Sequence, residues 1–183
     1  EIMPSLVGSE MCIRDSLWAQ HGFYLSSRPT FTFDPRLHAG AYYVQEAASM
    51  FLNRVIRQYV HEPVRYLDLC AAPGGKTFTI AERMNNKGRV LAFDLHKNRA
   101  GLIESGAKRL GLDCIRAGVN NAKVYDEKMP KADKVLCDAP CSGLGVIRRK
   151  PEIKYKEPSD FDRLPEIQYD ILKTSAELSL IHI

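Results

Sequence analysis

The feature that most constrains this chain is the segment from Asp68 to Thr77, which reads DLCAAPGGKT. It ends an apolar run at residues 64–69 and precedes a helical pattern, so it joins a buried strand to a helix through a short Gly-Gly turn. Open α/β sheets bind nucleotide-like cofactors at such strand ends. The segment therefore predicts a parallel α/β sheet with a cofactor crevice beside the glycines.

The same segment is close to a phosphate-binding loop, G-x-x-x-x-G-K-[ST], because Gly75, Lys76 and Thr77 match the end of that motif. The glycine expected five residues before Gly75 is Cys70, and Pro73 has no backbone N–H to offer a phosphate. A P-loop nucleotide-binding module is therefore the weaker alternative.

Strand and helix patterns alternate along the rest of the chain. They predict strands at 64–69, 89–93, 114–117 and 134–137, and helices at 45–59, 76–84, 98–110 and 165–178. Gly111 is a good stop for the helix at 98–110. This alternation predicts a parallel sheet with right-handed crossovers, a Rossmann-like α/β fold of which only about four strands are legible.

Composition excludes several classes of protein. The 183 residues are 45% hydrophobic and 26% charged, as in an ordinary soluble domain, and no apolar run is long enough to span a membrane. The net charge of +4 permits a polyanionic partner. Five cysteines in no regular framework fit a reducing cytoplasm and predict neither disulfides nor a zinc site. We expect a cytoplasmic monomer.

A second motif, Val135–Gly143 (VLCDAPCSG), again runs from an apolar strand into an acid, a proline and a cysteine. In this order, DLCAAPGGKT and DAPCSG resemble motifs I and IV of the bacterial 16S rRNA cytosine-C5 methyltransferases, in the RNA 5-methylcytosine methyltransferase family. His38–Met50 is similar to the segment that precedes motif I there, and the resemblance runs from about residue 17 to residue 178. It implies a class I methyltransferase fold, S-adenosylmethionine as cofactor and rRNA as substrate.

The resemblance also implies which residues hold the cofactor. The motif I residues are Cys70, Ala71, Ala72, Pro73, Gly74, Gly75 and Lys76, and Asp138 of motif IV lines both cofactor and base. Asp94 ends a strand where dinucleotide-binding folds place the acid that bonds ribose hydroxyls. The family's adenine-binding aspartate is best matched by Asn121, which keeps an acceptor but loses the charge, at a cost of about 1 kcal/mol. Asn121 as a plain turn residue, and Lys76 as a solvated lysine, remain open.

Two residues are candidates for the chemistry. Cys141 follows a proline at a strand end and would be the nucleophile by residue chemistry alone, since a thiolate adding to cytosine C6 activates C5. In the resembled family this cysteine assists product release, and a second cysteine in a Thr-Cys-Ser-like segment forms the adduct. No such segment is present, so we expect the chain to be inactive alone. Asp138 would accept from the exocyclic amine of the base.

Cations follow the second motif at Arg148, Arg149, Lys150 and Lys154, with Tyr155 among them. Such side chains could hold phosphates that flank a flipped base, while the ring stacks on it. The alternative is a solvated charged surface. Two further alternatives are an amino-methyltransferase, which Cys141 disfavours because it replaces the stacking aromatic, and a cofactor- or RNA-binding remnant without catalysis.

The two ends of the chain do not match what lies between them. Residues 1–16 show neither a helical nor a strand period, and 179–183 are similarly out of character; both resemble translated adapter sequence. Disordered tails are the alternative. We expect non-native tails at 1–16 and 179–183, a helical lead-in at 17–63 and a partial methyltransferase domain at 64–178.

Overall fold

A four-stranded parallel sheet forms the centre of the computed structural model, which describes residues 13–19, 22–25, 29–45, 47–59, 63–148 and 150–180. The strand order is β5-β4-β3-β6, and all neighbouring pairs are parallel. The strands are β3 (Arg65–Asp68), β4 (Arg89–Asp94), β5 (Ile115–Val119) and β6 (Lys134–Leu136). The predicted Rossmann-like α/β fold is confirmed.

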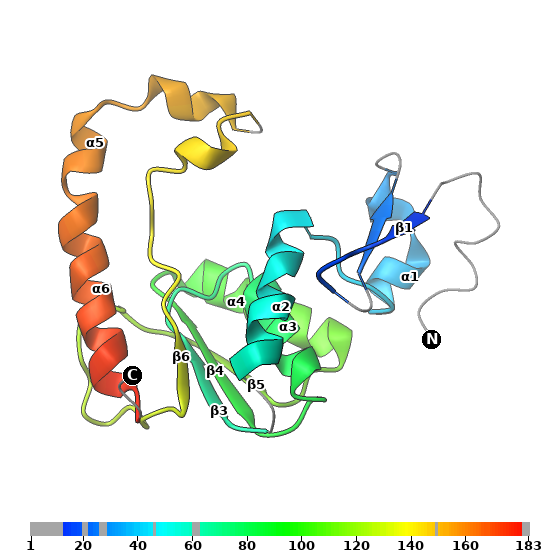
Figure 1. Ribbon diagram of the computed structural model, residues 1–183, viewed down its shortest axis with the longest axis horizontal. Helices are drawn as coiled ribbons and strands as arrows, with labels where there is room; N and C mark the ends of the chain where they lie inside the picture. Colours follow the sequence, from blue (N-terminus) through cyan, green and yellow to red (C-terminus); the bar gives the residue numbers. More distant parts are fainter. Residues whose placement is uncertain are drawn as a thin grey trace.

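Helices cover both faces of this sheet (Figure 1). Because side chains alternate along a strand, Tyr66 and Val90 enter one core, while Leu67 and Leu91 enter the other. The first core is closed by three helices and the second by one. These are α2 (Ala47–Tyr59), α3 (Gly75–Arg83) and α4 (Lys97–Leu110) on the first face, and α6 (Leu164–Leu178) on the second.

The observed boundaries lie within two residues of the predicted ones. The helix predicted from residue 45 begins at Ala47, and the strand predicted at 114–117 covers Ile115–Val119. Gly111 ends α4 in the left-handed conformation with φ +67°, as its position predicted. The strongly periodic elements were therefore predicted correctly, and only their ends moved.

An antiparallel hairpin that the sequence did not predict precedes the sheet. It pairs β1 (Ile13–Asp15) with β2 (Phe23–Leu25) and is followed by the short helices η1 (Phe31–Phe33) and α1 (Pro35–His38). Arg109 on α4 holds α1 and the segment after it, since its Nη1 donates to the carbonyl of Leu37 at 2.7 Å and to that of Tyr42 at 3.2 Å. The foreign origin of residues 1–16 stays a prediction, but β1 lies within them.

After β6 the chain leaves the sheet and returns as α6. The excursion contains η2 (Leu144–Val146), η3 (Pro151–Tyr155) and α5 (Ser159–Asp162), and it forms an arm beyond the sheet (Figure 1). Past α6, the Leu180 amide donates to the Ala132 carbonyl at 2.9 Å, so the chain starts to pair in parallel with the residues before β6. The foreign origin of 179–183 also stays a prediction.

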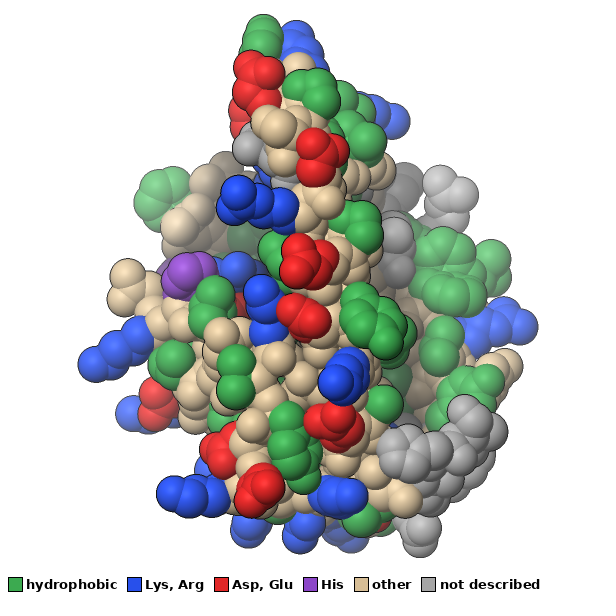
Figure 2. Space-filling view, turned by 90° about the vertical axis from the view of Figure 1, so that its left-hand side faces the viewer, with side chains coloured by type: hydrophobic (Ala, Val, Ile, Leu, Met, Phe, Trp, Pro, Cys, Tyr) green, Lys and Arg blue, Asp and Glu red, His purple; other side chains and the backbone are tan. Residues whose placement is uncertain are grey.

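The outward side of α6 mixes charged and hydrophobic side chains (Figure 2). Tyr169 and Leu172 are exposed there, while Ile171 and Leu178 face the core. Among the described residues, no helix combines the length and apolar character needed to cross a bilayer.

Candidate functional site

A pocket of about 220 Å³ opens at the carboxyl ends of β3 and β6, where motif I and motif IV meet. Three segments supply its wall: the stretch that leads into the first turn of α2, the end of β3 with the turn into α3, and the loop after β6. The lining residues are Tyr43, Val44, Gln45, Ser49, Asp68, Cys70, Ala71, Ala72, Pro73, Gly75, Lys76 and Asp138. The predicted crevice beside the glycines is therefore present.

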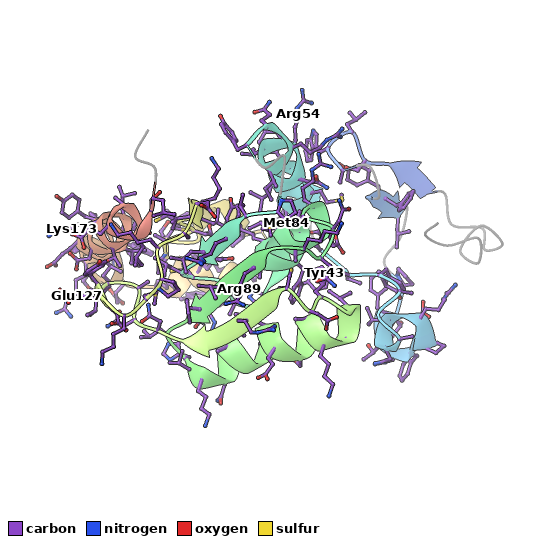
Figure 3. The ribbon with its side chains drawn as sticks, turned by 90° about the horizontal axis from the view of Figure 1, so that it is seen from below. Tyr43, Arg54, Met84, Arg89, Glu127 and Lys173 are labelled. Carbon is purple, nitrogen blue, oxygen red and sulfur yellow. The ribbon has the colours of Figure 1, made fainter. Side chains whose placement is uncertain are left out.

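The Gly-Gly turn is tightly built. Gly74 has φ +110°, and a Cβ at this position would lie 2.4 Å from Cζ of Phe78. A Cβ on Gly75 would lie 3.4 Å from the ring of Tyr43, which itself packs edge-on against Phe78 with centroids 5.2 Å apart. Tyr43 lies away from Lys173 on α6 (Figure 3). The turn thus requires glycine at residue 74 and brings backbone close to whatever occupies the pocket.

Lys76 and Asp138 join the two motifs directly. The Lys76 Nζ donates to Asp138 Oδ2 at 2.6 Å, and both side chains remain more than 40% exposed. Gln168 of α6 holds the same loop by donating to the Pro140 carbonyl at 2.7 Å. An exposed pair of this kind contributes little to stability, and both of its residues line the pocket.

Asp68 is a candidate that the sequence analysis missed. It lines the pocket, is 1% exposed and accepts a hydrogen bond on Oδ2 from Thr77 Oγ1 at 2.8 Å. Among the described residues, Oδ1 has no hydrogen-bond partner. Burial raises the pKa of this carboxyl to about 6, an effect that Asp138 increases and Thr77 opposes. The signal was available, because Asp68 is the first residue of the motif and the last of its strand.

The two cysteines of motifs I and IV, Cys70 and Cys141, differ in how exposed they are to solvent. Cys141 is exposed in the loop after β6 and does not line the pocket. Cys70 lines it but packs against the core around Leu67, and burial raises the pKa of its thiol to about 11. A thiol with so high a pKa is a poor nucleophile at neutral pH. The described residues contain no group of three or more His, Cys, Asp or Glu able to hold a metal.

Asp94 is buried, and each of its carboxylate oxygens has one partner and one further acceptor site. Oδ1 accepts from the His96 amide at 3.1 Å, and Oδ2 lies 3.4 Å from Arg99 Nη2. Arg99 also donates to the carbonyl of Ala72 at 3.0 Å, so it links Asp94 to the motif I turn. Asp94 lines neither the pocket nor the neighbouring hollow, but it lies at the same edge of the sheet.

Asn121 is exposed, and its Oδ1 accepts from the Lys123 amide at 3.2 Å. This is the turn geometry that was the alternative to a ligand role. The preceding residue, Asn120, was not considered from the sequence. Its Nδ2 is buried without a partner among the described residues, and its amide donates to the Asp94 carbonyl at 3.1 Å. Both asparagines line a hollow of about 540 Å³ after β5.

The predicted RNA-binding cations lie on the arm after β6. Arg148, Lys150 and Lys154 are exposed and form no ion pair with other described residues; Arg149 lies outside the described part. Lys154 Nζ is 5.0 Å from the centroid of the Tyr155 ring, which is 76% exposed. The arm therefore presents cations and an aromatic face to solvent. Like Asp138, it follows the carboxyl end of β6.

The family model described as 16S rRNA methyltransferase RsmB/F matches residues 58–180. The chain belongs to this family. The predicted resemblance is therefore confirmed. A curated RsmB/F relative, the probable ribosomal RNA small subunit methyltransferase B of Bacillus subtilis (strain 168), is 49% identical over 138 residues, which are 74% of this chain and 30% of the relative. This RsmB/F chain spans about a third of the length of the curated relatives that it matches.

Two solved structures resemble this RsmB/F chain along most of its length. The protein PH0851 superposes with a TM-score of 0.83 at 31% identity, covering 92% of this chain and 38% of that one. NSun6 from Pyrococcus horikoshii, solved with the ligand SFG, gives a TM-score of 0.73 at 30% identity, covering 83% and 38%. Both likenesses extend over the sheet and its helices, which supports the fold described above.

Proposed function

We propose that this chain is the cofactor-binding part of an enzyme that transfers a methyl group from S-adenosylmethionine to C5 of a cytosine in small-subunit rRNA. The observation that carries the proposal is the pocket in which Lys76 of motif I pairs with Asp138 of motif IV. Family membership supports the reaction class. A cytoplasmic location agrees with the free cysteines among the described residues.

The residues present fit S-adenosylmethionine, which supplies an electrophilic methyl group when bound. The turn at Gly74 and Gly75 lets the ligand approach the backbone closely. Asp94 and Asn120, at the ends of β4 and β5, offer a carboxylate and an amide for the ribose and the purine. In this proposal Asn120 replaces Asn121 as the purine contact, because the Asn121 carbonyl is already used in its turn.

The chain's own groups would orient the cytosine. C5 becomes nucleophilic when a thiolate adds to C6; after methyl transfer a base removes the C5 proton and the thiolate leaves. Asp138 would accept from the exocyclic amine of the base, and Lys76 would orient its carboxylate. Cys141, three residues after Asp138, is the last cysteine of the sequence and serves the release step. The adduct-forming cysteine of the resembled family is not among these residues.

We also propose that the arm binds RNA. Arg148, Lys150 and Lys154 are exposed cations that would hold phosphates on either side of the target base, and Tyr155 offers a ring for stacking. Arg149 is included on sequence alone. Ile153 of η3 is buried, so the turn that carries Lys154 and Tyr155 is anchored.

The test is calorimetric titration of the purified chain with S-adenosylmethionine and, separately, with Mg-ATP. We expect binding of the first only, and Lys76→Ala to weaken it because the ordered Asp138 carboxylate is lost. Lys108→Ala removes an exposed lysine of α4 outside the pocket and should change nothing. Binding of Mg-ATP without S-adenosylmethionine would replace this proposal by the P-loop alternative.

A further inference from the structure

Tyr43 forms the part of the pocket wall that covers the Gly-Gly turn. Its Cε1 and hydroxyl oxygen lie 3.4 Å from the place of a Cβ on Gly75, and its ring packs edge-on against Phe78. Tyr43 lies beside the helices of the first sheet face (Figure 3), and it packs against the core that they close. The shape of the pocket beside the turn therefore depends on where the backbone places Tyr43.

The segment that carries Tyr43, residues 39–45 between α1 and α2, belongs to no helix or strand. It bends at Gly40, which has φ +78°. The Tyr42 hydroxyl donates to Asp34 Oδ2 at 2.8 Å, which ties the segment to the start of α1 but not to the sheet. A further contact is therefore needed to hold the segment against the rest of the fold.

Arg109, near the end of α4, supplies that contact. Its Nη1 donates to the carbonyls of Leu37 at 2.7 Å and of Tyr42 at 3.2 Å, one on each side of the bend. The Arg109 carbonyl also packs on the bend, since a Cβ on Gly40 would overlap it. Within the described residues Arg109 forms no ion pair, so its charged group is used on backbone carbonyls. Charge-assisted hydrogen bonds of this kind are stronger than neutral ones.

The same side of α4 also holds the ring against which Tyr43 packs. A Cβ on Gly106 would lie 2.5 Å from Phe78 Cζ, so this glycine lets the ring lie directly on the helix. Gly106 and Arg109 are three residues apart and therefore neighbours on one side of α4. Burial raises the pKa of the Tyr43 hydroxyl, and the nearby charge of Arg109 acts against this increase. One helix thus holds Tyr43 both through its backbone and through its ring.

We propose that Arg109 is a positioning residue for the pocket: it holds the backbone on both sides of Gly40 and thereby places Tyr43 against the Gly-Gly turn. The inference rests on the proposed function, in which the pocket holds S-adenosylmethionine. Arg109 does not line the pocket, so it acts on a ligand only through Tyr43. Without Arg109 the segment would remain tied to α1 but could move away from the turn, and the pocket would lose a defined wall beside Gly75.

The test is a double-mutant cycle for the affinity of S-adenosylmethionine, measured by calorimetry on Arg109→Ala, Tyr43→Ala and the double variant. We expect Arg109→Ala to weaken binding about tenfold, the effect of losing one charge-assisted hydrogen bond. Tyr43→Ala should also weaken binding. Once Tyr43 is absent, Arg109→Ala should change the affinity by less than about twofold, because the two residues act as one unit.

Two further variants control the cycle. Arg109→Lys keeps a charged donor without the planar fork of arginine, so its affinity should lie within about threefold of that of the unaltered chain. Arg116 on β5 also donates to two carbonyls, those of Asp113 at 2.7 Å and Ile115 at 2.8 Å, but lies outside the pocket. Arg116→Ala should therefore leave the affinity unchanged.

The outcomes separate this inference from the proposed function. If the unaltered chain does not bind S-adenosylmethionine, both are overturned. If it binds and Tyr43→Ala binds equally well, or if the losses from the two single variants multiply in the double variant, the positioning role is refuted and the proposed function stands. Circular dichroism shows whether each variant folds. If Arg109→Ala does not fold, Arg109→Gln, which keeps only a neutral donor, takes its place in the cycle.

Discussion

Asp68 makes this chain less stable at neutral pH than at acid pH, by an amount that the structure allows us to estimate. Burial raises the carboxyl pKa from 3.8 to about 6. Below pH 3.8 the group is protonated whether the chain is folded or unfolded, so it contributes nothing. Between 3.8 and 6 the folded state binds more protons, so the free energy of unfolding falls as pH rises. Above pH 6 the loss is complete, at about 3 kcal/mol.

Asp68→Asn isolates this contribution. The amide does not titrate, so any cost that it carries in the core is the same at every pH. We therefore compare the free energy of unfolding of the variant with that of the unaltered chain. The difference, variant minus unaltered chain, should rise by about 3 kcal/mol between pH 3.5 and pH 7.5. Urea denaturation followed by circular dichroism at five or six pH values measures the difference. Every other titrating group is common to both chains and cancels.

A second variant, Asp34→Asn, tests the sign of this pH dependence of stability. Arg36 donates to Asp34 and holds the pKa of that carboxyl well below its usual range, so Asp34 stabilises the fold above its ordinary pKa and loses this effect as pH falls. The free energy of unfolding of Asp34→Asn minus that of the unaltered chain should therefore fall, not rise, as pH increases. If this difference in unfolding free energy does not change with pH for Asp68→Asn, or changes in the same direction for both variants, burial of Asp68 does not raise its pKa as we infer.

Two further predictions concern the turn and the arm. Gly74→Ala should unfold the chain or abolish cofactor binding, since its Cβ would lie 2.4 Å from the ring of Phe78 at a φ of +110°; thermal melts and titration measure this. Gly101→Ala, inside α4 with no atom within 4 Å of the added Cβ, should instead stabilise by about 0.5–1 kcal/mol. Replacing Lys150 and Lys154 by Ala should lower affinity for an rRNA fragment and reduce the slope of log affinity against log salt by about 1.4, from two single-strand phosphate contacts. An unchanged salt slope would show that the arm does not contact phosphate.

The parts of the fold that the sequence predicted are those where local pattern and tertiary packing agree. The strand ending at Asp68, the Gly-Gly turn and the helix α3 each carry their own periodic or turn signal, and all three occur as expected. The β1–β2 hairpin was not predicted because its strands have only three residues each, too few for a period. The 3₁₀ turns of the arm were not predicted, since within η3 they depend on one buried residue, Ile153.

The candidate site was predicted in its backbone but not in its hydrogen bonds. Lys76 and Asp138 were assigned from two motifs 62 residues apart, and the structure brings them into contact. Asn121 and Asn120 could not be distinguished by sequence, because which amide enters a turn depends on where β5 ends. Asp68 was passed over although its place, first in the motif and last in its strand, was visible in the sequence; only its burial and its unpaired oxygen needed the structure.

Stability and ligand recognition therefore oppose each other at Asp68. A neutral or apolar residue would remove the penalty of a buried charge, yet it would also remove a charged hydrogen-bond acceptor from the pocket wall. The ion pair of Lys76 and Asp138 does not relieve the penalty, because the Asp138 charge raises the pKa of Asp68 more than the Lys76 charge lowers it. A ligand that donates a hydrogen bond to the ionised Asp68 would relieve it, so such binding should stabilise this chain more at pH 7.5 than at pH 5. The excess stabilisation at the higher pH is the thermodynamic consequence of completing the Asp68 carboxylate, and it would be absent if the ligand contacted only the turn and the strand ends.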